Sequence, residues 1–386
     1  MQEHLVKRLL VKPYHYQQIS EHFDFIDSTE LAGFYSAINY NIVDSNRLTV
    51  GLDIKNERLV NSEFTDKQTG ITRSFVQSEY ANMSLFDTGI FIQDKQSFWD
   101  NKTQLTVGLR FDILELFDNQ VSYRFGLTHA FTPTLSAKIL YGSAYRSPSF
   151  LEFTRSPVGT QLPEVETMRT LEAHLNYHTK TLQLGLTVFH NNYDNFISRK
   201  NSFHESAQNL DAGVFSNIDN QVVTGLEFDS KYIITSEWSS FLNASWSYAK
   251  SLRADKALPL LADWTVTTGL EWHRSFAIGN IQFNNHLITY GQRRDWSSDL
   301  WNVGQTQRYP NRQKNFNAAF VVWNSILNYQ ISIEQQHTLD LSLSIHNVLD
   351  QQYYTQALIP PSPDKTASFD TQYSGRNIRF GISYSW

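Results

Sequence analysis

Cationic and aromatic side chains gather in one segment of the sequence, between residues 291 and 317. A guanidinium group pairs with anionic oxygen atoms, and an indole or phenol ring stacks on other rings. Together these groups would suit an anionic ligand that carries rings. Taken singly, each residue fits a solvated loop slightly better than a ligand site. The candidate residues are Arg293, Arg294, Trp296, Trp301, Arg308, Tyr309 and Arg312.

Other arrangements that could carry chemistry fail on spacing or composition. His174 and His178 are four residues apart, which on a strand is about 13 Å and too far for one metal ion. The chain has no cysteine, and it lacks H-E-x-x-H, G-x-S-x-G, phosphate-loop and dinucleotide motifs. Asp194, Asp211 and Asp219 could bind calcium, but they also fit a solvated loop. We therefore expect no catalytic residue, no metal site and no cofactor.

Composition narrows the class of protein further. The net charge is −6 and no basic cluster is present, which argues against nucleic-acid binding. The longest apolar runs, such as Ala318–Trp323, are far shorter than the roughly 20 residues of a membrane helix, and the mean hydropathy is −0.40. Residues 1–16 do not resemble a secretory signal peptide. Transmembrane β-strands remain possible, because they need apolar residues only at alternate positions.

Apolar residues recur at every second position along many segments. Between residues 105 and 113 every odd position is apolar, and Arg110 and Asp112 alternate with them. This period is that of β-strands with one apolar face. We expect about fifteen strands of roughly 9–13 residues, a length typical of membrane strands rather than of soluble β-proteins. The other clear segments are 121–127, 171–177, 182–188, 222–228, 242–248, 264–272, 339–345 and 380–386; weaker ones lie near 32–43, 47–60, 85–96, 134–145, 276–290 and 318–331.

The residues that alternate with the apolar ones are too often charged for a protein core, where an unpaired charge is costly. We expect these side chains to face the polar interior of a barrel, with Leu, Val, Phe and Trp facing lipid. The expected interior residues are Arg110, Asp112, Arg124, His174, Glu227, Asp229 and Glu271.

Long and short connections alternate when they are counted back from the C-terminus. The long ones cover about 347–377, 291–317, 249–262, 192–221 and 143–168, and the short ones lie near 334–336, 274–276, 235–237, 178–180 and 132–133. Outer-membrane barrels combine short periplasmic turns with long external loops. The alternation runs back to 61–84, with 118–120 as an unusually short external turn. We therefore predict an all-β fold, a transmembrane antiparallel β-barrel.

The last strand ends in alternating apolar and aromatic residues, namely Phe380, Ile382, Tyr384 and Trp386. This pattern resembles the signal that the barrel assembly machinery of the outer membrane reads on a closing strand. Any amphipathic closing strand would show the same alternation, so that alternative stays open.

Several segments resemble TonB-dependent outer-membrane receptors. His346–Tyr354 (HNVLDQQYY) is similar to that family's N-[LV]-[FL]-D-x-x-Y-Y segment, and Tyr141–Phe153 (YGSAYRSPSFLEF) to its Y-x-x-x-[FY]-R-x-P-[ST]-x-x-E-[LF] segment. The downstream Leu162-Pro163-Glu164 and Val188–Ile197 continue the family's pattern. The resemblance covers residues 85–386. Physically, these motifs fit strand ends and loop starts, so positioning of the loop is the expected role of Arg146 and Glu152.

The resemblance implies a receptor barrel of 22 strands, preceded by a signal peptide, a TonB-binding box and a plug domain. None of these preceding parts is recognisable here. We therefore expect residues 31–386 to be the C-terminal part of the barrel, and residues 1–30 a partial strand or external loop. The sequence would then be a fragment of a longer receptor.

By the same resemblance, the protein would be a transporter in the outer membrane of a Gram-negative bacterium, and not an enzyme. It would take up a metal chelate, most often a ferric siderophore, by TonB-driven transport. Its partners would be the TonB complex, the barrel assembly machinery and outer-membrane lipid. The segment Ser147–Arg169 lacks the histidine of haem receptors. The alternatives are a passive diffusion porin of 16–18 strands and, third, an outer-membrane enzyme.

Overall fold

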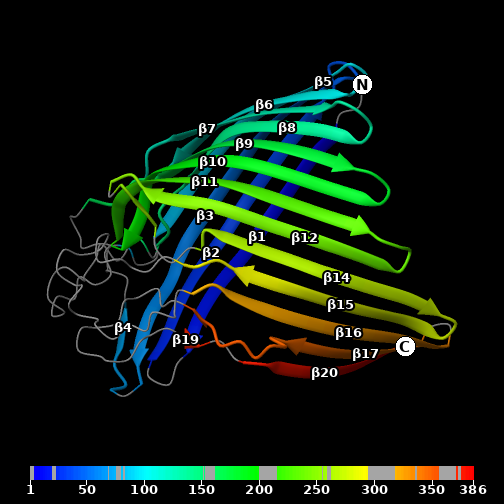
Figure 1. Ribbon diagram of the computed structural model, residues 1–386. Coiled ribbons are helices and arrows are strands. Elements are labelled where there is room, and N and C mark those ends of the chain that lie inside the picture. The colour runs from blue at the N-terminus through cyan, green and yellow to red at the C-terminus, as the bar shows by residue number, and fades with distance from the viewer. Residues whose placement is uncertain are drawn as a thin grey trace. The chain divides into compact units, whose positions relative to one another are not determined.

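Most of the described chain is β-strand in the computed structural model (Figure 1). The structure describes residues 4–19, 23–67, 69–74, 80, 83–150, 152, 161–199, 215–253, 255–258, 262–293, 318–334, 337–355, 371–372 and 375–386. Eighteen strand segments form one antiparallel sheet, and two further segments pair separately. Within the described ranges, no helix is both long enough and apolar enough to cross a membrane.

The chain divides into two compact units. The first comprises residues 1–130, 138–172 and 191–222, and the second residues 131–137, 173–190 and 223–386. The first unit contains β1 (His4–Ile19), β2 (Phe23–Tyr40), β3 (Asn46–Asp66), β4 (Thr72–Ser74), β5 (Ser84–Phe98), β6 (Thr103–Leu114) and β7 (Gln120–Ala130).

Four strands contribute residues to both units: β8 (Leu135–Arg146), β9 (Glu166–His178), β10 (Leu182–Arg199) and β11 (Phe215–Ile233). The second unit continues with β12 (Trp238–Ser251), β13 (Lys256–Ala257), β14 (Trp264–Phe276), β15 (Gly279–Tyr290), β16 (Phe320–Glu334), β17 (His337–His346) and β20 (Asn377–Ser385). The separate pair is β18 (Tyr354–Thr355) with β19 (Thr371–Gln372).

The strand prediction is confirmed in number and in pattern. Two of the eighteen segments, β4 and β13, have only three and two residues, so sixteen long strands remain where about fifteen were expected. Neighbours in sequence pair as antiparallel hairpins, as β14, β15, β16 and β17 do side by side in Figure 1. Residues 1–30, expected to be a partial strand or an external loop, contain the whole of β1 and the beginning of β2.

From β3 to β20 short and long connections alternate as the sequence predicted, with the β6–β7 turn as the expected short exception, whereas β1 and β2 are joined by only three residues. One turn is shifted: the residues Arg274–Phe276 still belong to β14, and Ala277 and Ile278 make the turn to β15. Strands β3, β10 and β11 have 21, 18 and 19 residues, and so exceed the expected strand length. Their extra residues lie at the end of the sheet that carries the long connections.

In the first unit, charged and apolar side chains lie on opposite faces of the sheet. Arg110 pairs with Asp112 on its own strand and with Asp53 on β3, whereas its sequence neighbours Leu109 and Phe111 are exposed on the other face. Direct cross-strand partners extend this apolar face, since Val50 is opposite Ile92 and Ile92 is opposite Leu109. Soluble proteins rarely expose so continuous an apolar surface, but lipid would cover it.

The second unit has the same two faces. Lys231 lies 3.5 Å from Glu271 on the polar face, and Asp229 lies next to Gly185. The opposite face carries a row of direct cross-strand partners that runs over six strands: Trp238, Trp272, Phe283, Leu327, Leu343 and Phe380. The alternation predicted from sequence is thus present in both units.

Aromatic rings on the polar face lie directly over glycines of neighbouring strands. Phe91 covers Gly51, Phe189 covers Gly225, and Phe241 covers a third glycine at position 269. A Cβ on Gly225 would lie 2.4 Å from the Phe189 ring and 2.7 Å from the carbonyl oxygen of Trp246. Because that oxygen belongs to a paired backbone, the ring alone cannot make room. The glycines therefore allow the rings to lie against the wall of the sheet.

We predict that Gly225→Ala lowers the unfolding free energy by about 1–3 kcal/mol, because it overpacks a fixed site. The matched control is Gly33→Ala, where the nearest atom would be the Ile54 carbonyl oxygen at an ordinary 3.4 Å. Heat-modifiable gel mobility of the protein in outer membranes would measure the temperature of unfolding. Equal unfolding temperatures for the two variants would contradict the packing argument.

Candidate functional site

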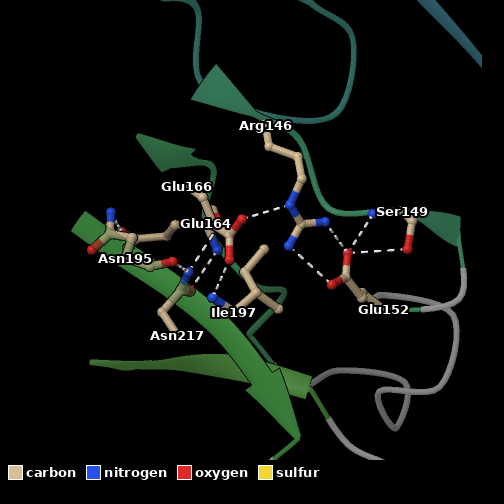
Figure 2. Close-up of polar contacts among 8 residues, drawn as sticks. All are labelled: Arg146, Ser149, Glu152, Glu164, Glu166, Asn195, Ile197 and Asn217. Atoms are coloured by element: carbon tan, nitrogen blue, oxygen red, sulfur yellow. Dashed lines mark hydrogen bonds and ion pairs between the residues drawn. The ribbon is translucent and has the colours of Figure 1, made fainter. Parts of the chain in front are cut away.

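The most connected polar site lies where β8 ends and the next long connection begins. Arg146 is the last residue of β8, and Ser147 and Pro148 follow it. Proline cannot donate to a strand ladder, so the chain leaves the sheet at this point. Figure 2 shows the side chains that surround Arg146, all from the first unit. We call this network the Arg146 clasp; it comprises Arg146, Ser149, Glu152, Glu164, Glu166, Asn195, Ile197 and Asn217.

The centre of the clasp is a two-pronged pair between Arg146 and Glu152. Nη1 of Arg146 donates to Oε2 of Glu152 at 2.7 Å, and Nη2 donates to Oε1 at 3.0 Å. The backbone N–H and the hydroxyl of Ser149 also donate to Oε2, at 2.8 and 3.0 Å. A planar guanidinium fits a carboxylate in this way, and the pairing fixes both groups. The loop after β8 is thereby closed on itself.

Glu166, the first residue of β9, extends the clasp to another strand. One carboxylate oxygen accepts a hydrogen bond from Nε of Arg146 at 2.5 Å, and the other accepts from the backbone N–H of Ile197 on β10. All three nitrogen atoms of the Arg146 guanidinium therefore donate a hydrogen bond to a carboxylate. Arg146 is half-exposed, but both of its acidic partners are largely covered.

Asn217 connects the clasp to β11. Its side-chain oxygen accepts from the backbone N–H of Glu164 at 2.7 Å, and its amide group donates to the carbonyl oxygens of Glu164 and Asn195 at 3.0 and 2.6 Å. Asn195 has a left-handed backbone, with φ of 59°, and its side chain donates to the carboxylate of Glu164. Such a backbone suits asparagine and marks an irregular point in β10. The amide of Asn217 thus replaces regular pairing there.

An apolar cluster packs the same loop against β3. Phe150 is buried against Leu59 of β3, and Leu116, Phe117 and Leu162 pack around them. Phe150 belongs to the Arg-Ser-Pro-Ser-Phe segment and Leu162 to the Leu-Pro-Glu segment. Both sequence motifs therefore contribute a polar group to the clasp and an apolar group to this cluster.

A cavity of about 410 Å³ lies between the loop after β8 and the polar face of β3, β5 and β6. Its charged lining groups neutralise one another. Lys55 lies 2.8 Å from Glu57, Arg110 is paired with two carboxylates, and Arg146 is held in the clasp. Asp112, which holds Arg110, has only 3% of its side chain exposed. In the described lining, every cation thus already has an acidic partner, so this cavity does not suit an anionic ligand.

The segment 291–317, which the sequence singled out for ligand binding, is described only at its beginning. Arg293 is half-buried, with its guanidinium carbon 5.5 Å from the centre of the Phe320 ring. Tyr290 and Tyr353 stack on the same ring at 4.9 and 4.7 Å. Arg293 therefore takes part in an aromatic stack of the second unit. The other candidates, Arg294, Trp296, Trp301, Arg308, Tyr309 and Arg312, lie outside the described residues.

The His346–Tyr354 motif ends β17 and holds the closing strand. The side chain of Asn347 is fully buried, accepts from the N–H of Gln351 and donates to its carbonyl oxygen, at 2.9 Å each. Asp350 accepts from the N–H of Arg376, just before β20. Both Asn347 and Asp350 have positive φ angles, of 56° and 53°. The motif is architectural, as its residue types suggested.

The four residues of the C-terminal pattern are all exposed on or just after β20: Phe380, Ile382, Tyr384 and Trp386. Tyr384 additionally stacks on His337 and shares a hydrogen bond with its ring at 2.7 Å. Their role in barrel assembly stays a prediction. In the part of the chain that the structure describes, no three His, Asp or Glu side chains come together as metal ligands would.

Burial alone would raise the pKa of Glu152, but the hydrogen bonds from Arg146 and from Ser149 outweigh this effect. The pKa of Glu152 therefore lies below its ordinary value. The carboxylate stays ionised well into the acid range, which keeps the clasp closed at neutral pH.

Long antiparallel strands with one polar and one apolar face, joined by alternating short and long connections, define a membrane β-barrel protein. Residues 11–348 match the family described as TonB dependent receptor-like, beta-barrel. The chain therefore belongs to the TonB-dependent receptors, a family of transporters and not of enzymes. A search of curated proteins gave no match.

Solved structures with the same fold are receptors and transporters by their names. The ferric yersiniabactin uptake receptor FyuA from Yersinia pestis has a TM-score of 0.68 and 13% identity, over 99% of this chain and 58% of that chain. The copper transporter OprC has a TM-score of 0.70 and 15% identity, over 94% of this chain and 58% of that chain. The ferric enterobactin receptor PfeA from Pseudomonas aeruginosa has a TM-score of 0.66 and 17% identity, over 94% of this chain and 55% of that chain. The chain thus spans little more than half the length of these structures, and the likeness shows the fold.

Sequence reasoning found part of this site. It assigned Arg146 and Glu152 to positioning of the loop, and their mutual contacts support that role. It named Glu164 only as part of the next motif, without a role. It missed Glu166 and Asn217. Asn217 is 53 residues from Glu164, and a single asparagine at the beginning of a strand gives no signal of such a contact.

We predict that Arg146→Ala lowers the unfolding free energy by about 1–2 kcal/mol, after discounting for its half-exposed side chain. The loss arises because Glu152 and Glu166 lose their cationic partner and keep only the hydrogen bonds from Ser149 and Ile197. Arg169→Ala is the matched control, since it removes a single, more exposed ion pair with Asp194 and should cost less than about 1 kcal/mol. Urea unfolding of the purified protein would measure both. A cost for Arg146→Ala no larger than that of the control would contradict the clasp.

We predict that Glu152 makes stability depend on pH in the acid range. Its pKa is lower in the folded state, so its contribution is complete above the unfolded pKa and disappears as the pH falls through the folded pKa. The gap in unfolding free energy between the wild type and Glu152→Gln should therefore close as the pH is lowered from about 7 to about 3. Unfolding curves at several pH values would show it, and a constant gap would contradict the argument.

Proposed function

We propose that the chain forms the barrel part of an outer-membrane receptor that takes up a metal chelate, with a ferric siderophore as the ligand. The observation that carries this proposal is the match of residues 11–348 to the receptor family, on a sheet with one polar and one apolar face. The names of FyuA and PfeA add support, since both are receptors for ferric chelates.

The division of charges within the chain favours capture by the long loops. In the described cavity beside the clasp, arginine and lysine are already neutralised by carboxylates. The segment 291–317, by contrast, has four arginines among its aromatic residues. An anionic chelate with rings would find its partners there. The clasp would hold the neighbouring loops in place, and the polar face would line the path.

Energy for uptake would come from the TonB complex, acting on a plug domain. The barrel assembly machinery and lipid of the Gram-negative outer membrane are the other partners in this proposal. Sixteen long strands would also suffice for a passive porin, the alternative that the sequence left open. The family match favours the receptor, because the porin alternative had only the strand count in its support.

We predict that cells carrying the gene take up a ferric chelate faster than a deletion strain, and only when TonB is present. Arg294→Ala/Arg308→Ala/Arg312→Ala should raise the chelate concentration for half-maximal uptake by about tenfold or more, because charged hydrogen bonds are lost. Arg253→Ala, in another long connection, is the control that should leave uptake unchanged. Radioactive iron uptake measures all strains over a panel of siderophores.

Uptake that persists without TonB would favour the porin. If the wild type takes up iron with none of the siderophores in the panel, the ferric siderophore is refuted as the ligand. Equal values for the triple variant and the Arg253→Ala control would move ligand capture away from residues 294–312.

A further inference from the structure

The short connections of the sheet carry large apolar side chains at their tips. In the first unit, Ile42 in the β2–β3 turn is 61% exposed and Trp99 in the β5–β6 turn is 71% exposed. In the second unit, Ile278 in the β14–β15 turn is 61% exposed. Exposed turns are normally built of small and polar residues. Something other than water should therefore cover these tips.

Trp99 shows that the exposure is built in. It has a φ angle of 51°, and Asp100 and Asn101 after it also have positive φ angles. This backbone region is unfavourable for a bulky residue, and such strain persists only where the surroundings impose it. The backbone N–H of Lys102 donates to the Trp99 carbonyl, and the ring lies edge-on to His129 at 6.3 Å. The turn thus holds its largest apolar side chain outward although the backbone conformation at Trp99 is unfavourable.

The tips of the first unit continue its apolar face. The two turns are joined, because the N–H of Ser97 donates to the carbonyl oxygen of Ser45 at 2.7 Å. Ile38, on the apolar face of β2 and four residues before Ile42, is exposed and lies directly opposite Val50. The apolar surface that lipid would cover therefore reaches the end of β2, where the turn with Ile42 begins.

The second unit repeats the pattern at successive turns. Ile234 follows β11, Ile278 follows β14, and Ile333 lies at the end of β16; all three are exposed. Successive turns of this kind are two strands apart, or about 10 Å, so the three tips extend over about 20 Å of sheet edge. A feature that recurs along the edge, and in both units, suits a continuous medium better than one partner protein.

We propose that these turn tips insert into the phospholipid headgroup layer at the short-turn end of the sheet. The inference rests on the proposed membrane location and adds the depth at which the turns lie. Tryptophan suits this layer, because its ring is apolar and its N–H can reach water or a headgroup. Arg274 lies over the Phe276 ring at 5.5 Å and is paired with Glu237 of the neighbouring short turn at 3.6 Å, so its charge stays at the polar rim of the turns. The β9–β10 turn differs, with Lys180 and two threonines and no apolar tip.

The absence of cysteine gives a direct test, since an introduced cysteine is unique in this chain. Val43, next to Ile42 in the β2–β3 turn, is itself 55% exposed. Val43→Cys and Ile278→Cys would each receive a nitroxide label in protein purified from outer membranes and returned to phosphatidylethanolamine–phosphatidylglycerol vesicles. Leu109→Cys, in the middle of the apolar face, is the lipid reference, and Lys180→Cys is the water reference. Collisions with oxygen and with a water-soluble nickel complex report depth.

At Val43 and Ile278 we expect an oxygen-to-nickel collision ratio severalfold above that at Lys180 and below that at Leu109. A ratio equal to that at Lys180 would place the tips in water and overturn the proposal. Protection from both reagents would mean contact with protein and would overturn it too. If Leu109 itself gave the value of water, the membrane location would fail, which is a different outcome from failure of the turn tips alone.

Discussion

Backbone hydrogen bonding is the constraint on which the rest of this structure depends. Lipid offers no partner to an N–H or a C=O group, so a chain that crosses it in extended form must pair every strand with another. The antiparallel registers meet this demand over runs of nine to eighteen residue pairs, for example between β2 and β3 or between β14 and β15. Once strands are paired in this way, successive side chains must point to opposite faces. The two faces, one charged and one apolar, follow from that geometry.

The ends of the strands obey different rules, because there the pairing stops. At the long-connection end, side chains bond to the backbone: Asn217 bonds to three backbone groups of Glu164 and Asn195, and Asn347 bonds to two backbone groups of Gln351 after β17. Arg146 bonds to two carboxylates from different segments, Glu152 and Glu166. Its positive charge offsets their mutual repulsion and holds the two segments together. In these interactions a polar side chain makes the hydrogen bonds that a neighbouring strand makes elsewhere. They fix the loops that begin where the strands end.

What could be predicted from the sequence follows from which interactions are local. The faces were predictable, since Leu109 and Arg110 differ by one position and the period of a strand is two. The ends of β17 and β8 were predictable from Asn347 and Pro148, whose preferences act within a few residues. Glu166 and Asn217 were not, because their partners are brought together only by the order of strands. The 21 residues of β3 also exceeded expectation, because pairing outside the membrane needs no apolar alternation.

Charge within the chain separates architecture from recognition. The positive groups beside the clasp are already committed to carboxylates, and an incoming anion would have to displace them at the cost of leaving acids unpaired. In the proposed receptor, a polar wall would let water and a hydrophilic ligand pass without holding an anion tightly. Tight capture requires cations that no acid neutralises, and such groups can be kept in water-exposed loops at little cost. Evolution of a new ligand preference would then change the loops and leave the clasp and the wall as they are.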